Sequence, residues 1–169
     1  MIQRTQSLWL FLVFIGGILL CFFPVMTLDN MQNGGSNICQ YEIGIKGLEQ
    51  TFAHGQELDE PQSVSGMTNW GLTLISIIYP LIAFITIFLY KHRIAQARLC
   101  VVNIILMLGY YALLAWYSWL ALNTESVFAN DYTVEVPACI PLVSVILTVL
   151  ALRGILKDEA LIRSMNRIR

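Results

Sequence analysis

Residues 70–123 read WGLTLISIIYPLIAFITIFLYKHRIAQARLCVVNIILMLGYYALLAWYSWLALN, and this stretch decides the fold. It contains two uncharged apolar runs, 70–90 and 99–122. Each run is long enough to cross the hydrocarbon core of a membrane, which takes roughly 20 helical residues. Neither run keeps the polar face of a helix in a soluble protein, which argues against a buried helix pair in such a protein. The stretch therefore predicts a helical hairpin that spans a membrane.

The turn between the two runs, residues 91–98, fixes the orientation of the hairpin. It carries Lys91, Arg93 and Arg98. Short loops rich in lysine and arginine stay on the cytoplasmic side of a membrane. We therefore expect the turn to lie in the cytoplasm and the outer ends of both runs to face the other compartment.

Composition and charge agree with this topology. The chain has 169 residues, 57% hydrophobic and 12% charged, which suits a single membrane domain. The N-terminus, the turn and the tail from Arg153 hold every basic residue except Lys46. The remaining segments hold every acidic residue except Asp158 and Glu159. This separation supports the topology, and it argues against nucleic-acid binding because no basic surface with interleaved aromatic residues is present.

Two further apolar runs, 8–28 and 137–153, complete a predicted set of four spans. The first is interpreted as an uncleaved anchor, because bulky residues at 22–26 replace the small residues that signal cleavage requires. Gly16-Gly17 would let a neighbouring helix approach closely. Pro80 is expected to kink the second span and to free the carbonyl of Ser76 for a neighbouring group. The predicted fold class is an all-α membrane protein, a four-transmembrane-helix bundle formed by the single domain 1–169.

The outer loops, 29–69 and 123–136, are expected to form a small extracytoplasmic β-sheet cap. Residues 38–45 alternate in polarity and could pair with 25–31 as a hairpin across a Gly-rich turn. Residues 132–136 also alternate and could add a short strand to it. By contrast, 54–65 is interpreted as an irregular acidic loop.

The spans lack the groups that most membrane chemistry needs. Apart from Arg153 at the end of the fourth span, no Asp, Glu, Lys, Arg or His occurs in them, which argues against a coupled transporter or proton channel. Asn103 is interpreted as an interhelical hydrogen-bonding residue. His54 with three nearby carboxylates is too weak a pattern for a metal site. No catalytic motif is present, so we expect no enzyme activity, no cofactor and no metal.

Four cysteines divide between the spans and the outer loops. Cys21 and Cys100 fall in spans, where thiols behave as small apolar side chains. Cys39 and Cys139 fall on the outer side, where disulfides can persist. We hypothesise that they pair and join the strand region to the entry of the fourth span.

The cytoplasmic tail, 154–169, is expected to continue the fourth helix past Arg153 as an amphipathic segment. One face carries apolar residues and another face carries arginines. The residues concerned are Leu161, Met165 and Ile168 on the first face, and Arg163 and Arg167 on the second. Two interpretations remain open: a helix that docks on anionic headgroups or a partner, and a basic flank that only sets topology.

Both ends of the chain resemble one family. The sequences concerned are MIQRTQSLWL, residues 1–10, and KDEALIRSMNRIR, residues 157–169. They resemble the end signatures of a set of small four-span membrane proteins of unknown function from Gram-negative bacteria. This resemblance implies a bacterial inner-membrane location with periplasmic outer loops, and it carries no catalytic residues. The order of helices and strands also looks like the claudin-type tetraspan layout, in topology only.

These observations lead to two functional hypotheses. The first is a non-enzymatic inner-membrane component, with both termini cytoplasmic, that contacts membrane lipids and binds a protein partner or a second copy of itself. The alternative is a transport protein for small molecules or lipids, with an uncharged cavity near Pro80.

Overall fold

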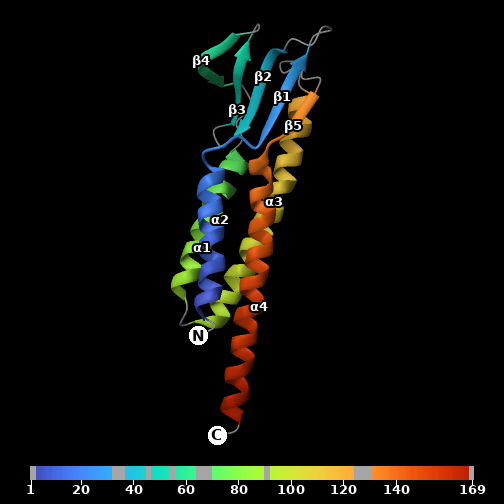
Figure 1. The fold of residues 1–169 in the computed structure, drawn as a ribbon. Coiled ribbons are helices and arrows are strands. Elements are labelled where there is room, and N and C mark those ends of the chain that lie inside the picture. The colour runs from blue at the N-terminus through green and yellow to red at the C-terminus, as the bar shows by residue number, and fades with distance from the viewer. Residues whose placement is uncertain are drawn as a thin grey trace.

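The computed structural model describes residues 3–31, 37–44, 47–53, 56–63, 70–89, 92–123 and 131–167. Four long helices lie side by side, and a small sheet covers one end of them (Figure 1). Both chain termini lie at the other end of the molecule. We call the two ends the sheet end and the basic end.

The helices form a ring in which each one packs on two neighbours. α1 packs on α2 and α4, and α3 packs on the same two helices. Their bounds are Gln3–Leu20 for α1, Trp70–Phe88 for α2, Arg93–Leu122 for α3 and Ile140–Arg167 for α4. Three segments, Trp70–Phe88, Arg93–Leu120 and Val136–Leu161, are long and apolar enough to cross a membrane, and α1 contributes a shorter apolar stretch, Thr5–Leu20.

The predicted bounds of the helices need two corrections, and one expectation about α4 is met. α1 ends at Leu20 and not at residue 28, because the apolar residues Val25, Met26 and Leu28 are buried against the sheet and the bundle. α3 already begins at Arg93, so most of the predicted turn 91–98 is helical. α4 continues without interruption from Ile140 to Arg167, as expected for a helix that passes Arg153.

The sheet has five antiparallel strands in the order β4-β3-β2-β1-β5. The predicted hairpin is confirmed: β1 (Met26–Met31) pairs with β2 (Asn37–Gly44), and Leu28 lies opposite Tyr41. The predicted short strand is also confirmed, because β5 (Asp131–Val134) pairs with β1. Val136 does not extend β5, since Val136–Cys139 forms a 3₁₀ helix, η2, that leads into α4.

Two strands were not expected. β3 (Gly47–Ala53) pairs with β2, and β4 (Gln56–Ser63) pairs with β3. The prediction of an irregular loop over 54–65 is therefore wrong for most of its length. Gly47 opens β3 with φ of 128°, a conformation that glycine adopts far more readily than other residues. The fold class all-α is also too narrow, because the cap is a five-stranded sheet.

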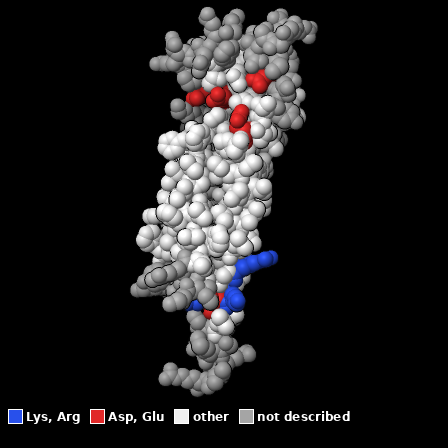
Figure 2. Space-filling model, in the orientation of Figure 1, with Lys and Arg blue, Asp and Glu red and all other residues white. Residues whose placement is uncertain are grey.

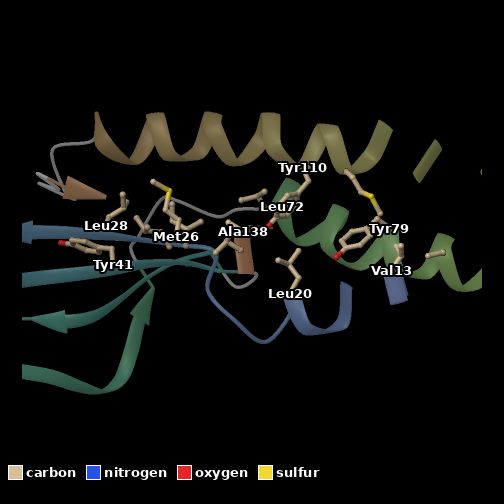
Figure 3. Packing of buried hydrophobic residues seen from close by; sticks show 14 residues of the cluster. Val13, Leu20, Met26, Leu28, Tyr41, Leu72, Tyr79, Tyr110 and Ala138 are labelled. Atoms are coloured by element: carbon tan, nitrogen blue, oxygen red, sulfur yellow. The ribbon is translucent and has the colours of Figure 1, made fainter. Parts of the chain in front are cut away.

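The largest apolar cluster joins the sheet to the helices. Met26, Leu28 and Tyr41 of the sheet are buried with Leu72 of α2 and Tyr110 of α3 (Figure 3). The Ser118 hydroxyl of α3 also lies 3.1 Å from the Met26 sulfur. Burial of several large side chains of this kind contributes roughly 1.5–3 kcal/mol each. The sheet is therefore packed on the bundle as part of a single core.

Candidate functional site

The outer surface of the bundle is apolar between its two ends. Figure 2 shows a broad uncharged belt, with acidic residues near the sheet end and basic residues near the other end. Leu74 of α2, Ile105 of α3 and Ile146 of α4 are all more than half exposed. Buried residues between the helices include polar ones, among them Asn103, Ser144 and Thr148. An apolar surface this broad, with polar residues among the buried ones, is the reverse of what water favours.

Aromatic residues gather where the belt meets the sheet end. Trp70, Trp116 and Trp119 are exposed, and the rings of Trp116 and Trp119 lie 5.8 Å apart. Phe22 and Phe23, which follow α1, are exposed as well. Tryptophan is enriched where membrane and water meet.

A buried hydrogen bond joins the two ends of the chain at the basic end. The Gln6 side-chain amide of α1 donates to the Asp158 carboxylate of α4 over 2.8 Å. The exposed fractions of the two side chains are 6% and 8%. Gly154 gives Gln6 its space, because a Cβ there would lie 2.9 Å from Gln6 Cγ. Hydrogen bonds to charged groups are stronger than neutral ones, so this contact fixes α4 against α1 where the bundle ends.

Beyond this contact α4 projects past the other three helices. Figure 1 shows its last turns extending alone below the bundle. The helix continues for nine residues after Asp158, which corresponds to roughly 14 Å. Leu161 on this segment is 50% exposed. The segment continues α4 as one uninterrupted helix.

The predicted tail residues are placed only in part. Arg163, Met165 and Arg167 lie within the projecting part of α4. Their side chains, and residue Ile168 as a whole, lie outside what the structure describes. The tail is therefore a helix, and its predicted apolar face remains a prediction apart from Leu161.

Pro80 lies at a close contact between α1 and α2. A Cβ on Gly17 would be 2.6 Å from Pro80 Cβ, so only glycine allows this approach. Gly16 faces α4, where Ile140 and Ser144 are its nearest neighbours. The pair Gly16-Gly17 thus serves two neighbouring helices.

The carbonyl that Pro80 deprives of a helical donor has found another partner. Pro80 has no N–H to offer to Ser76, four residues earlier. The Cys21 thiol donates to the Gly17 carbonyl over 3.3 Å, and its sulfur makes a longer contact of 3.9 Å with the Ser76 carbonyl oxygen. The neighbouring group expected at this carbonyl is therefore a thiol, and its contact there is weak.

The predicted bridge between Cys39 and Cys139 is not formed, and all four cysteines are free thiols. Cys39 lies opposite Asn30 in the sheet, whereas Cys139 ends η2 near the end of β1 that faces the helices. The chain just before Cys139 is held near Val25, because the Glu135 N–H donates to the Val25 carbonyl. Val25 and Asn30 are five residues apart, which corresponds to roughly 17 Å along a strand. A disulfide needs Cα atoms within about 7 Å, so the two thiols are at opposite ends of the sheet.

Acidic side chains gather in a cleft between the sheet and the end of α1. The cleft is lined by Phe22 and Phe23, and by Glu42 and Glu49, which lie opposite each other on β2 and β3. Burial raises the pKa of the Glu42 carboxyl, and the charges of Glu49 and Glu135 raise it further. Like charges placed directly opposite across strands are destabilising. The described part of the chain contains no group of three His, Cys, Asp or Glu suited to a metal ion, and His54 is outside that part.

The comparison with protein families gives one result. A family described as Domain of unknown function (DUF4293) matches residues 2–168. The chain belongs to this family. No curated protein matches the chain. The resemblance of both chain ends to an uncharacterised family is thereby confirmed, and DUF4293 membership assigns no catalytic or ligand-binding residue.

Sequence reasoning missed the central contact of this DUF4293 chain, the bond between Gln6 and Asp158. A signal for it was present. Asp158 and Glu159 were the only acidic residues among the basic segments, and an exception to a charge pattern often marks a specific partner. Gln6 and Asp158 also lie in the two end segments that carried the family resemblance.

Proposed function

We propose that this DUF4293 chain is a non-enzymatic membrane protein that crosses a bacterial inner membrane four times and holds a protein partner at its basic end. The apolar belt supports the membrane part of the proposal, because such a surface is stable in lipid and unfavourable in water. α2 is about 28 Å long, close to the roughly 30 Å of a hydrocarbon core.

The charges support an orientation with both termini in the cytoplasm. Arg93, Arg98, Arg153 and Lys157 lie at the basic end, the end at which both termini lie. Positive residues favour the cytoplasmic side, and the tryptophans at the sheet end suit the opposite interface. The sheet would then face the periplasm.

The observation that carries the docking function is the projection of α4. The part of α4 that extends alone from the bundle carries the apolar side chain of Leu161, which is half exposed. Amphipathic helices commonly dock in grooves of partner proteins. The buried Gln6–Asp158 contact holds the base of the projection, so the segment is presented in a fixed direction.

The proposal is tested by purification from the native membrane in mild detergent, followed by mass spectrometry of bound proteins. The full chain is compared with a variant that stops after Ala160, which retains Gln6 and Asp158. A control variant, Val134→Ser, alters an exposed residue at the sheet end instead. A stoichiometric protein that is lost only on truncation supports docking at α4. If no other protein is recovered with the full chain, the proposal is refuted. If only a second copy of the chain is recovered, self-association replaces binding of a different protein.

The alternative of a carrier with a cavity near Pro80 receives less support. The Pro80 ring lies against Gly17, and Tyr79 beside it is fully buried. This level of the bundle is closely packed. A retained lipid or small molecule in a partner-free preparation would nevertheless favour the carrier over the docking protein.

A further inference from the structure

The interior of the helical bundle contains two separate apolar clusters. The basic-end cluster consists of Leu10, Cys100, Ala151 and Ile155. The sheet-end cluster begins at Val13 on α1 and at Met107 on α3, and it extends up to the sheet. Every helix therefore passes from one cluster to the other within about one or two turns.

Three helices place a polar residue at this crossing, and we call these residues the polar layer. They are Thr86 of α2, Asn103 of α3 and Thr148 of α4, and none is more than 1% exposed. Asn103 lies one turn from Cys100 on one side and one turn from Met107 on the other. Thr148 lies one turn from Ala151, and Thr86 directly precedes Ile87, which packs on the basic-end cluster.

The two threonines and the asparagine differ in their hydrogen bonds. The Thr86 hydroxyl donates to the Ile82 carbonyl over 2.6 Å, and the Thr148 hydroxyl donates to the Ser144 carbonyl over 2.7 Å. Each hydroxyl oxygen can still accept a hydrogen bond. Asn103 makes no hydrogen bond to the protein through either its amide oxygen or its amide nitrogen.

An amide without partners is unfavourable in a protein interior, and more so within a membrane, where lipid offers no replacement. Asn103 needs a donor for its oxygen and an acceptor for its N–H groups, and the threonine oxygens need donors. Charged ligands do not fit, because the nearest charged residues along α3 and α4, Arg98 and Arg153, are exposed and lie five residues from Asn103 and Thr148. A small neutral molecule that both donates and accepts meets all of these requirements.

We propose that the polar layer binds water inside the bundle, with Asn103 as its principal ligand. Buried water typically makes about three hydrogen bonds to groups that the protein leaves unpaired. This hydrated layer is independent of partner docking at α4, since it lies within the spans and not at the basic end.

The test is solid-state NMR of the full ¹⁵N-labelled chain in lipid bilayers, with magnetisation transferred from water to the protein. The Asn103 side-chain amide signal is identified by its loss in Asn103→Leu, and by backbone assignment if that variant does not fold. The backbone amides of Leu10 and Ala151 are dry references in the basic-end cluster. The exposed side chain of Asn123 is the hydrated reference.

Transfer from water to the Asn103 side chain well above that of Leu10 and Ala151 is the expected result. Thr86→Val and Thr148→Val should each reduce this transfer, because they remove an acceptor from the layer. Transfer no greater than that of the dry references overturns the proposal. A signal to Asn103 from a lipid or from a retained organic molecule in place of water also overturns it.

Discussion

Replacing Gly17 by alanine should loosen the contact between α1 and α2. The new Cβ would lie 2.6 Å and 2.9 Å from two carbons of the Pro80 ring and 3.0 Å from Tyr79 Cζ. Neither neighbour can give way, because the proline ring is part of the backbone of α2 and Tyr79 is fully buried. Ordinary contact begins near 3.4 Å, so the helices must separate by several tenths of an ångström.

The size of the effect follows from two opposing contributions. Overpacking of this kind typically costs about 1–3 kcal/mol. Alanine is a better helix former than glycine by roughly 1 kcal/mol, which offsets part of that cost. We therefore expect Gly17→Ala to lower the free energy of unfolding by up to about 2 kcal/mol.

The matched control is Gly109→Ala on α3. A Cβ there would meet only Ile75 Cδ1, at an ordinary 3.9 Å, so the propensity gain should appear alone. The assay is reversible unfolding in mixed micelles, followed by tryptophan fluorescence and helical circular dichroism. If Gly17→Ala were as stabilising as Gly109→Ala, the close approach of α1 and α2 at Pro80 would be refuted.

Three further outcomes are expected. Alanine substitutions of Gln6 and Asp158 in a double-mutant cycle should give a coupling free energy of about 1.5–3 kcal/mol, and additive effects would contradict the buried bond. The pKa of Glu42 is raised in the folded chain, so the folded state holds its proton more tightly and stability falls as pH rises above about 4.5, the ordinary pKa. Glu42→Gln should therefore be more stable than the parent at neutral pH and equal to it well below that value, as measured by unfolding over a pH series; a stabilisation that persists at low pH would contradict the assignment. A maleimide added to the unfolded chain without reductant should modify both Cys39 and Cys139, as measured by mass spectrometry. If neither thiol is labelled until a reductant is added, the disulfide hypothesis is restored.

The sequence predicted those elements whose pattern is local. The alternation around Tyr41 and Ile43 predicted β2, because both side chains face the core. β3 and β4 escaped prediction because their stabilisation comes from pairing with β2, and their own residues show no clear alternation. The end of α1 was misplaced for a similar reason: Val25 and Met26 are apolar enough for a helix, and only the sheet determines where they pack.

Contacts between distant residues were harder to predict than elements. Nothing in their spacing shows that Gln6 meets Asp158, because 152 positions separate them. The Cys21 sulfur reaches the Ser76 carbonyl because Gly17 and Pro80 let α1 and α2 approach closely. The sequence predicted that this carbonyl needs a neighbouring group, and it did not predict which one. Asn103 was expected to bond across helices, and the structure shows that its amide has no protein partner.

The pairing of β5 with β1 has a mechanical consequence. β1 follows α1 and β5 precedes α4, so the pairing of these strands holds the two helices together at the sheet end. The hydrogen bond between Gln6 and Asp158 holds them together at the basic end. α4 is thereby fixed at two points along its length, and the part after Asp158 projects on the side away from the sheet. A load that tilts the sheet would therefore move the end of α4, and the chain could transmit a displacement from the sheet end to the basic end without any helix being broken.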